Sequence, residues 1–419
     1  MDPNASSSEG SPRASAKWLN RSTVGVSLAS LFSDVSHELA TAVLPIVLLS
    51  FGAGGAALGL IEGSADGVSA IAKLWGGLRA DRVRRRKPLA AFGYLVTATG
   101  TAAIGLCTQS STVLLCRVAA WIGRGSRSAA RDVLMSEAAP ADAQGRAFGM
   151  ERAADALGAV LGPLLALLLI SLGTPAAHVM RWSLVPGLLA FLSISLVVQE
   201  RPNPLPERPR TFRASLVGTG RPFQRTLLGV FTFGCGDFAR TLLILYVVQH
   251  VRGTLFSFSA ATLSISLYVL HNAVSALCAF PLGALTDRIG RRPVIIAGYL
   301  FAAGVTTGFA MLPPTPSLLA LLFIGSGIGE ACKEVAEKAY AAELLPKEAK
   351  GTGMGVLAAV NGVGDLISSA MVGALWTLFP DRPAIGLIAA AGLQAAGALV
   401  LGSANRADRA QSGQARRIE

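Results

Sequence analysis

The sequence predicts an all-α polytopic membrane protein with twelve transmembrane helices in two pseudo-symmetric six-helix bundles. Of its 419 residues, 52% are hydrophobic and only 15% are charged, whereas soluble domains carry about 25% charged residues. Apolar stretches of about 20 residues, the length that crosses a bilayer as a helix, follow one another along the chain. The second half also repeats motifs of the first half at a constant offset.

The apolar stretches give the predicted elements in order. Residues 1–22 are polar and Ser-rich and lack the apolar run of a cleavable signal peptide, so we expect a disordered cytoplasmic tail there. The predicted spans are 23–50, 56–79, 88–107, 111–136, 146–172, 180–198, 224–250, 257–286, 293–312, 316–343, 350–379 and 383–403. A basic, Pro-rich segment at 199–223 is the expected cytoplasmic linker between an N-terminal bundle (23–198) and a C-terminal bundle (224–403). Residues 404–419 are expected to form a cytoplasmic tail.

Basic residues concentrate in alternate loops and predict the orientation. Cytoplasmic loops retain Lys and Arg, and basic clusters lie at 82–87, 201–221 and 288–292 and in the C-terminal tail. Both termini are therefore expected in the cytoplasm of a protein of the inner (plasma) membrane, with the lipid bilayer as its partner. These loops account for most of the net charge of +12, so nucleic-acid binding, which needs clustered phosphate contacts, is not expected.

No chemistry other than transport is indicated by a motif. The sequence has neither a recognisable catalytic triad nor a phosphate-binding glycine loop, and its five cysteines have no paired spacing. We therefore expect no enzymatic activity and no cofactor, and energy from an ion gradient. The expected oligomeric state is a monomer.

An internal repeat is the strongest sign of two homologous halves. The motif Gly77-x3-Asp81-Arg82-x2-Arg85-Arg86 recurs as Gly283-x3-Asp287-Arg288-Ile-Gly290-Arg291-Arg292, an offset of 287 − 81 = 206. The same offset relates Pro140, Gly145, Gly149 and Gly158 to Pro346, Gly351, Gly355 and Gly364. Two regions in one register indicate parallel six-helix repeats about an axis normal to the membrane.

With these motifs, residues 23–403 resemble the major facilitator superfamily (MFS), whose loop motif reads G-x-L-[AS]-D-x-x-G-[RK]-[RK]. The second copy matches it closely, whereas the first has Arg79 for Leu and Arg84 for the second Gly. Because Gly permits φ > 0, Arg84 predicts a different local turn. The resemblance implies the MFS fold and a gating role for this loop motif. Its candidate residues are Gly77, Asp81, Arg82, Arg85, Arg86, Gly283, Asp287, Arg288, Gly290, Arg291 and Arg292; the alternative is a plain positive-inside anchor.

Two further resemblances concern the direction of transport and the solute. Gly158-x3-Gly162-Pro163 looks like the start of the superfamily's antiporter motif, which implies export, with simple helix packing as the alternative. Three segments resemble a bacterial branch that includes nickel-resistance exporters, namely Asp34-Val-Ser-His-Glu38 followed by Leu44-Pro45, Leu60-Ile-Glu-Gly63, and Gly123-Arg-Gly-Ser-Arg-x3-Arg131-Asp132. His37 stands where that branch has Ser, and Leu39 where it has Met. No metal ligand set is assigned.

Ionisable residues inside the predicted spans are the candidate transport residues, because each costs roughly 2.5–3.5 kcal/mol near the bilayer centre and needs a partner or an aqueous cavity. Asp34 and Glu38 share one face of the first helix beside His37, where they could bind a proton or a divalent cation. The second helix carries Glu62, which lies near enough to the outer end for solvation to be the alternative, and Asp66. On the fourth helix, Arg117, Arg124, Arg127 and Arg131 form one stripe, whose innermost members are expected to pair with acids such as Asp34, Glu38 or Asp155 or to bind an anionic solute. The second-half candidates are Asp237, Arg240, His271, Asn272, Glu330, Lys333, Glu334, Asn361 and Asp365.

By the 206 offset, Arg124, Arg127 and Arg131 correspond to Glu330, Lys333 and Glu337, so two of the three charges are inverted and the two halves are expected to present opposed charged stripes to a central cavity. The sequence thus predicts a secondary transporter working by alternating access, with proton-coupled efflux of a drug or a divalent metal cation as the leading hypothesis. Proton-coupled import of an anionic solute is the alternative. A transporter-like receptor or scaffold is a rival from another class, favoured if all buried charges pair and no cavity remains.

Overall fold

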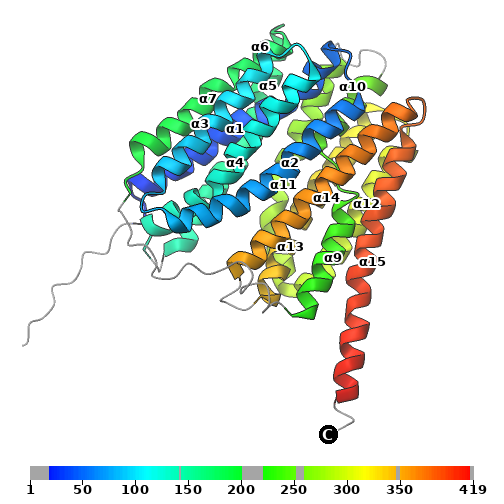
Figure 1. The fold of residues 1–419 in the computed structure, drawn as a ribbon. Coiled ribbons are helices and arrows are strands. Elements are labelled where there is room, and N and C mark those ends of the chain that lie inside the picture. Colours follow the sequence, from blue (N-terminus) through cyan, green and yellow to red (C-terminus); the bar gives the residue numbers. More distant parts are fainter. Residues whose placement is uncertain (1–17, 141–142, 201–219, 252–258, 346–349, 416–419) are drawn as a thin grey trace, which may run out of the picture.

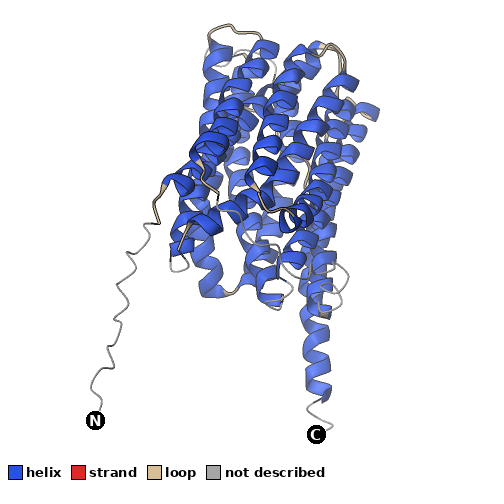
Figure 2. Ribbon diagram, turned by 60° about the vertical axis from the view of Figure 1, so that its left-hand side comes forward, coloured by secondary structure: helices blue, strands red, loops and turns tan. Residues whose placement is uncertain are grey.

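The computed structural model describes residues 18–140, 143–200, 220–251, 259–345 and 350–415, with only the backbone described at 78, 81–82, 144–145, 342, 350–352 and 404–415. The described residues form helices joined by loops and contain no strand (Figure 2). The predicted all-α class is therefore confirmed. Most of the predicted N-terminal tail (1–22) and most of the predicted linker (199–223) lie outside the described residues.

The first half begins at a well-capped helix. The Asn20 side chain accepts hydrogen bonds from the backbone N–H groups of Ser22 and Thr23, which satisfies donors that a helix start leaves free. The helices of this half are α1 (Arg21–Ser50), α2 (Gly55–Arg82), α3 (Lys87–Ala103) with the 3₁₀ turn η1 (Ile104–Leu106), α4 (Ser110–Ala138), α5 (Gln144–Ser171), α6 (Ala176–Trp182) and α7 (Leu184–Leu192), ending in a π-helical turn (Ser193–Val197). The last three together occupy the predicted sixth span.

The second half repeats this arrangement beside the first (Figure 1). Its helices are α9 (Arg221–Gly234), α10 (Arg240–His250), α11 (Ala260–Ile289), α12 (Arg291–Met311), α13 (Pro316–Leu344), α14 (Lys350–Leu378) and α15 (Ala384–Ala415). The prediction of one continuous helix over 224–250 is wrong, because the backbone breaks between α9 and α10. The last helix runs beyond the predicted boundary at 403 and projects from the bundle.

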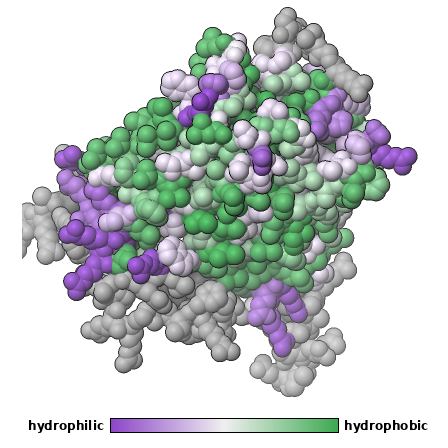
Figure 3. Space-filling model, turned by 45° about the horizontal axis from the view of Figure 1, so that its top comes forward, coloured by the Kyte–Doolittle hydropathy of each residue, from purple (hydrophilic) through white to green (hydrophobic). Residues whose placement is uncertain are grey.

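Eight helices among the described residues are long and apolar enough to cross a membrane. The predicted spans that fall short are α2, α4, α13 and the α9–α10 pair. Three of these carry several charged residues, and the fourth is broken. Apolar side chains cover most of the visible surface, with hydrophilic ones gathered toward its edges (Figure 3). The charged helices therefore depend on protein partners and a cavity rather than on lipid.

The halves meet most closely where α2 packs on α14, α5 on α11 and α1 on α10. We call the end where α1 begins the terminal end and the opposite end the far end. Glycines at four-residue spacing let α2 approach α14 closely: a Cβ on Gly59 would lie 2.1 Å from the Ser369 carbonyl oxygen, and one on Gly63 would lie 2.8 Å from that of Leu366. Such spacing is typical of close helix contacts in membranes.

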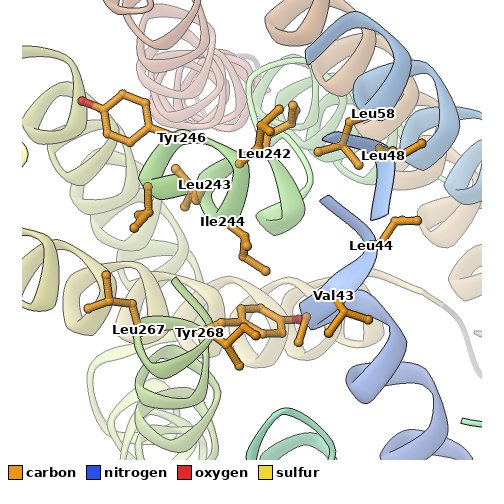
Figure 4. Close-up of a cluster of buried hydrophobic side chains, with 14 of the residues drawn as sticks. Val43, Leu44, Leu48, Leu58, Leu242, Leu243, Ile244, Tyr246, Leu267 and Tyr268 are labelled. Atoms are coloured by element: carbon orange, nitrogen blue, oxygen red, sulfur yellow. The ribbon is translucent and has the colours of Figure 1, made fainter. Parts of the chain in front are cut away.

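An apolar cluster from both halves closes the far end (Figure 4). It includes Val43, Leu44 and Leu48 of α1, Leu58 of α2, Leu242, Leu243 and Ile244 of α10, and Leu267 and Tyr268 of α11, all at most 5% exposed. Close-packed side chains of this kind leave no aqueous route. Among the described residues, this cluster therefore separates the space between the halves from the far side.

Candidate functional site

The carboxylate face of α1 lies directly against α5. A Cβ on Gly158 would lie 2.9 Å from the Asp34 Cβ, and one on Gly162 would lie 2.8 Å from the Glu38 Cβ. Pro163 lies within α5 just after this contact. The glycines of the antiporter-like motif therefore let α5 pack on the two acidic residues that the sequence singled out.

This contact predicts that Gly162→Val lowers stability. The new side chain would overlap α1, and overpacking of this kind costs about 1–3 kcal/mol. Gly149→Val is the matched control, because a Cβ there meets nothing within 4 Å on the same helix. The melting temperature of the purified protein in detergent should fall for Gly162→Val well beyond the control. Equal changes would contradict the packing role.

Asp34 and His37 take different partners. The Asp34 Oδ1 lies 3.2 Å from the Arg124 Nη2. His37 packs edge-on against Trp121 at 4.7 Å between ring centroids, and its Nε2 lies 3.7 Å from the Glu38 Oε1. The predicted pairing of Arg124 with Asp34 is therefore present.

Glu38 joins the two halves. Its Oε2 accepts a hydrogen bond from the Tyr268 Oη at 2.7 Å and another from the Asn272 Nδ2 at 3.3 Å, both on α11. The Asn272 amide also donates to the Ala159 carbonyl oxygen on α5 at 2.8 Å. Within the described residues, the two bonds to Glu38 are the only hydrogen bonds between side chains of opposite halves. An acid that gains a proton would accept these donors less strongly, so its charge affects contact between the halves.

Glu62 and Asp66 lie in a buried cluster with Arg117. Glu62 is only 4% exposed, so the alternative of a solvated residue is wrong. Its two carboxylate oxygens lie 2.9 and 3.0 Å from the Arg117 Nη2, and the guanidinium stacks over the Trp121 ring at 3.8 Å. The Trp121 Nε1 in turn donates to the Asp66 Oδ1 at 2.9 Å.

Arg127 has no acidic partner among the described residues, although its neighbour in the stripe does. Its Nη2 donates to the Ser33 Oγ at 2.5 Å, and its guanidinium lies 3.7 Å from the centroid of the Tyr94 ring. Its Nε and Nη1 have no hydrogen-bond acceptor. The side chain is 4% exposed, so the prediction that the innermost arginines pair with acids fails at this position and leaves a buried positive charge beside the cavity.

Four second-half candidates form a neutral, closed network. The Asp237 carboxylate lies 3.0 Å from the Arg240 Nη1 and 2.5 Å from the Lys333 Nζ. Glu330 contacts Arg240 and lies 3.1 Å from the Lys333 Nζ. Two acids and two bases thus satisfy one another within one half. Every ion pair among the described residues likewise stays within its half, so the opposed stripes do not pair across the interface.

The break between α9 and α10 positions this network. A Cβ on Gly236 would lie 2.2 Å from the Ala390 carbonyl oxygen, so only Gly fits there. Side chains replace the missing helical hydrogen bonds: the Gln394 amide donates to the Gly236 oxygen at 2.9 Å, and the Ser368 hydroxyl donates to the Asp237 oxygen at 3.0 Å. Irregular backbone inside a membrane protein requires such partners.

Glu337 is a buried acid that was not among the candidate transport residues chosen from the sequence. It is 3% exposed and accepts hydrogen bonds from the Tyr299 hydroxyl at 2.5 Å and the Asn361 amide at 2.9 Å. No cation pairs with it in the described part of the chain. The 206 offset was a signal for it, because Glu337 corresponds to Arg131 of the charged stripe.

The remaining candidates differ in their surroundings. His271 is 3% exposed and stacks near Tyr268 at 6.1 Å. Glu334 is exposed and lies 2.6 Å from the Lys338 Nζ. The Asp365 carboxylate has neither a hydrogen bond nor an ion pair with a described residue. The described residues contain no group of three or more His, Cys, Asp and Glu side chains that could hold a metal ion.

Two adjoining cavities lie between the halves on the terminal side. The α4 cavity, about 370 Å³, is lined by Ser30, Ser33, Asp34, Lys73, Arg124, Arg127, Ser128, Arg131, Asp132, Arg152, Asp155, Glu334 and Lys338. The α14 cavity, about 270 Å³, is lined by Asp66, Ser69, Ala70, Lys73, Glu330, Lys333, Glu334, Glu337, Lys338, Met354, Leu357, Ala358, Asn361, Gly362 and Asp365. Lys73, Glu334 and Lys338 border both. Most predicted charged candidates are thus brought to one space.

The duplicated loop motif takes two different turns. Gly290 alone joins α11 to α12 with φ of 95°, a conformation that suits Gly. In the first copy the four residues 83–86 join α2 to α3, in agreement with the different turn expected where Arg84 replaces Gly.

For the motif side chains that the structure describes, contacts stay within each half. Arg86 lies 2.6 Å from Glu137, and Arg291 lies 3.2 Å from Glu343. Arg292 contacts the Leu401 carbonyl oxygen. Arg85, Asp287 and Arg288 are exposed, Gly77 and Gly283 lie on their helices facing Ala129 and Val335, and the side chains of Asp81 and Arg82 lie outside the described residues.

Comparisons with known proteins agree with this architecture. The family model described as Major Facilitator Superfamily matches residues 26–270 and 226–418. An uncharacterised MFS-type transporter of Methanocaldococcus jannaschii is 30% identical over 364 residues, 87% of this chain and 90% of the relative. A probable 4-methylmuconolactone transporter of Cupriavidus pinatubonensis is 27% identical over 318 residues, 75% of this chain and 73% of the relative.

Solved structures support the same fold. A bacterial homologue of the human lysosomal transporter Spinster, in an inward-facing and occupied conformation, superposes with a TM-score of 0.73 at 16% identity, covering 92% of this chain and 96% of that chain. Two six-helix halves around a charged central cavity, the matching family model and these relatives together establish that the chain belongs to the Major Facilitator Superfamily and is a secondary transporter of a multi-pass membrane fold.

Proposed function

We propose that the protein is a proton-coupled exporter of a small organic solute that works by alternating access in the inner membrane, with both termini in the cytoplasm. The observation that carries the proposal is Glu38, a carboxylate of one half that accepts hydrogen bonds from Tyr268 and Asn272 of the other. A proton on this group would weaken both bonds and bias the halves toward another arrangement. In this orientation the closed far end faces outward.

Asp34 is the second proposed proton site. Its ion pair with Arg124 borders the α4 cavity. In the export cycle, a proton from outside would neutralise Asp34 or Glu38 and release the solute outward, and loss of that proton to the cytoplasm would restore the loaded state. The loop motif would then latch the halves in the opposite state, since its contacts here lie within each half.

The proposal is tested in proteoliposomes with a trapped pH indicator. For a solute found by a thermal-shift screen of divalent metals, cationic drugs and organic anions, we expect addition of solute to move protons through the wild-type protein. Asp34→Asn should abolish this proton movement, and a measurable melting temperature would show that the variant is still folded. Asp381 is an exposed loop residue at the far end, so Asp381→Asn should leave the proton movement unchanged. Normal proton movement in Asp34→Asn would remove Asp34 from the mechanism.

Import of an anionic solute is the second candidate function. The observation that favours it is the unpaired, buried charge of Arg127 at the α4 cavity. Everted membrane vesicles distinguish the two, since an exporter accumulates solute in vesicles that are acidic inside. Accumulation only in right-side-out vesicles with an acidic exterior would favour import. If only divalent metals raise the melting temperature in the thermal-shift screen, the metal-exporter hypothesis is favoured.

A receptor or scaffold role is less well supported. That role would suit a molecule whose buried charges are all paired and whose centre is filled. Here Arg127 and Asp365 lack ion pairs with described residues, and cavities of about 370 and 270 Å³ remain between the halves.

A further inference from the structure

Away from the border that the two cavities share, the charges without an ion pair to a described residue differ in sign. Arg127 borders the α4 cavity alone, whereas Lys73 lies at the shared border, and neither has an ion pair with a described residue. On the α14 cavity, Asp66, Glu337 and Asp365 lack ion pairs as well. The other charged residues of these walls largely cancel, because Arg124 pairs with Asp34, Lys338 with Glu334, and Lys333 with Asp237 and Glu330.

On the positive side, the Arg127 guanidinium is buried and held by protein groups rather than by solvent. Arg127 is 4% exposed, and two of its guanidinium N–H groups, at Nε and Nη1, have no acceptor. The Ser33 hydroxyl and the Tyr94 ring hold the guanidinium in place. An uncompensated buried cation and orphan donors are both costly, and an anionic group on a bound molecule would satisfy both.

The negative side offers the complementary arrangement. Asp365 borders the α14 cavity, and its carboxylate has neither a hydrogen bond nor an ion pair with a described residue; among these residues, only Trp121 donates a hydrogen bond to the Asp66 carboxylate. The two acids come from α14 and α2, which pack together across the interface between the halves. A cationic group held here would contact both halves at once.

We infer that the transported solute is a zwitterion, whose anionic group binds at Arg127 and whose cationic group binds at Asp365 and Asp66. This inference rests on the proposed transport function and adds the substrate class. A solute with one charge satisfies only one of these walls and leaves the other uncompensated. A zwitterion satisfies both without a change in the net charge of the cavity.

The test measures binding without any gradient, so its failure is separate from failure of transport. Isothermal titration calorimetry on the purified protein in detergent micelles at pH 7 would compare 6-aminohexanoate with hexanoate and hexylammonium, which share its length and carry one charge each; 4-aminobutyrate and 8-aminooctanoate extend the series. We expect one of the zwitterions to bind about tenfold or more tightly than either singly charged analogue of its own length, because a hydrogen-bonded charge contributes at least that factor.

Two variants assign the ends of the bound molecule. Arg127→Gln should bind the zwitterion no better than the alkylammonium, and Asp365→Asn should bind it no better than the carboxylate. The loop variants Arg382→Gln and Asp381→Asn, matched in chemistry and exposed, should bind as the wild-type protein does. Equal affinity for singly charged and zwitterionic probes, binding by none of them, or identical losses in variant and control pairs would each overturn the inference. Binding of the zwitterion without proton-coupled transport would instead overturn the proposed function alone.

Discussion

Glu38→Gln should abolish proton-driven accumulation of the solute while leaving solute exchange intact. Gln has nearly the same shape and can accept from Tyr268 and Asn272, but it cannot bind and release a proton. The halves would then still rearrange around bound solute, whereas the step that couples this rearrangement to the proton gradient would be lost. Proteoliposomes with an imposed pH difference measure accumulation, and counterflow of labelled solute at equal pH measures exchange.

Tyr268→Phe separates the proton site from the contact between the halves. It removes the 2.7 Å hydrogen bond to Glu38 and leaves the carboxylate in place. Accumulation should therefore persist, with an altered rate of exchange. If Glu38→Gln still accumulates solute against its gradient, Glu38 is not the coupling residue; if Tyr268→Phe loses accumulation to the same extent, the hydrogen bond rather than the proton is essential.

Most helix positions followed from the sequence because eight of the spans are runs of apolar residues of bilayer length, and the two halves followed from the 206 offset. The break before Arg240 did not follow, although Gly234 and Gly236 lie where it begins in the sequence. Hydropathy measures the mean polarity of a window and is insensitive to a local loss of helical hydrogen bonds. The Ser368, Ser369 and Gln394 side chains, from distant helices, form hydrogen bonds with backbone groups of the break and stabilise it.

The candidate residues were found more easily than their partners. A charge at membrane depth is visible in the sequence, and spacing assigns it to a helix face. Which helix lies opposite that face depends on tertiary packing. Arg124 therefore forms the expected ion pair with Asp34, whereas Arg127 packs on the Tyr94 ring. The same limit explains Glu62: its position near a predicted helix end suggested solvent, but α4 brings Arg117 and Trp121 over it.

That buried pair predicts the largest loss of stability. In Glu62→Gln, the Arg117 guanidinium would remain fully buried within a span, with its charge uncompensated, and breaking a buried pair in this way costs about 3–5 kcal/mol. The exposed pair of Glu334 and Lys338 provides the control, because Glu334→Gln is the same substitution and exposed pairs contribute only about 0–1 kcal/mol. Chemical denaturation in detergent micelles measures both free energies of unfolding.

The double variant Glu62→Gln, Arg117→Met distinguishes an unpaired charge from lost packing. Met is flexible enough to fill the space over Trp121 without a charge, so the double variant should regain most of the stability that Glu62→Gln loses. If it is as unstable as the single variant, the role of Arg117 is its packing on Trp121. If Glu62→Gln costs no more than Glu334→Gln, Glu62 carries no charge in the folded protein and becomes a further proposed proton site beside Asp34 and Glu38.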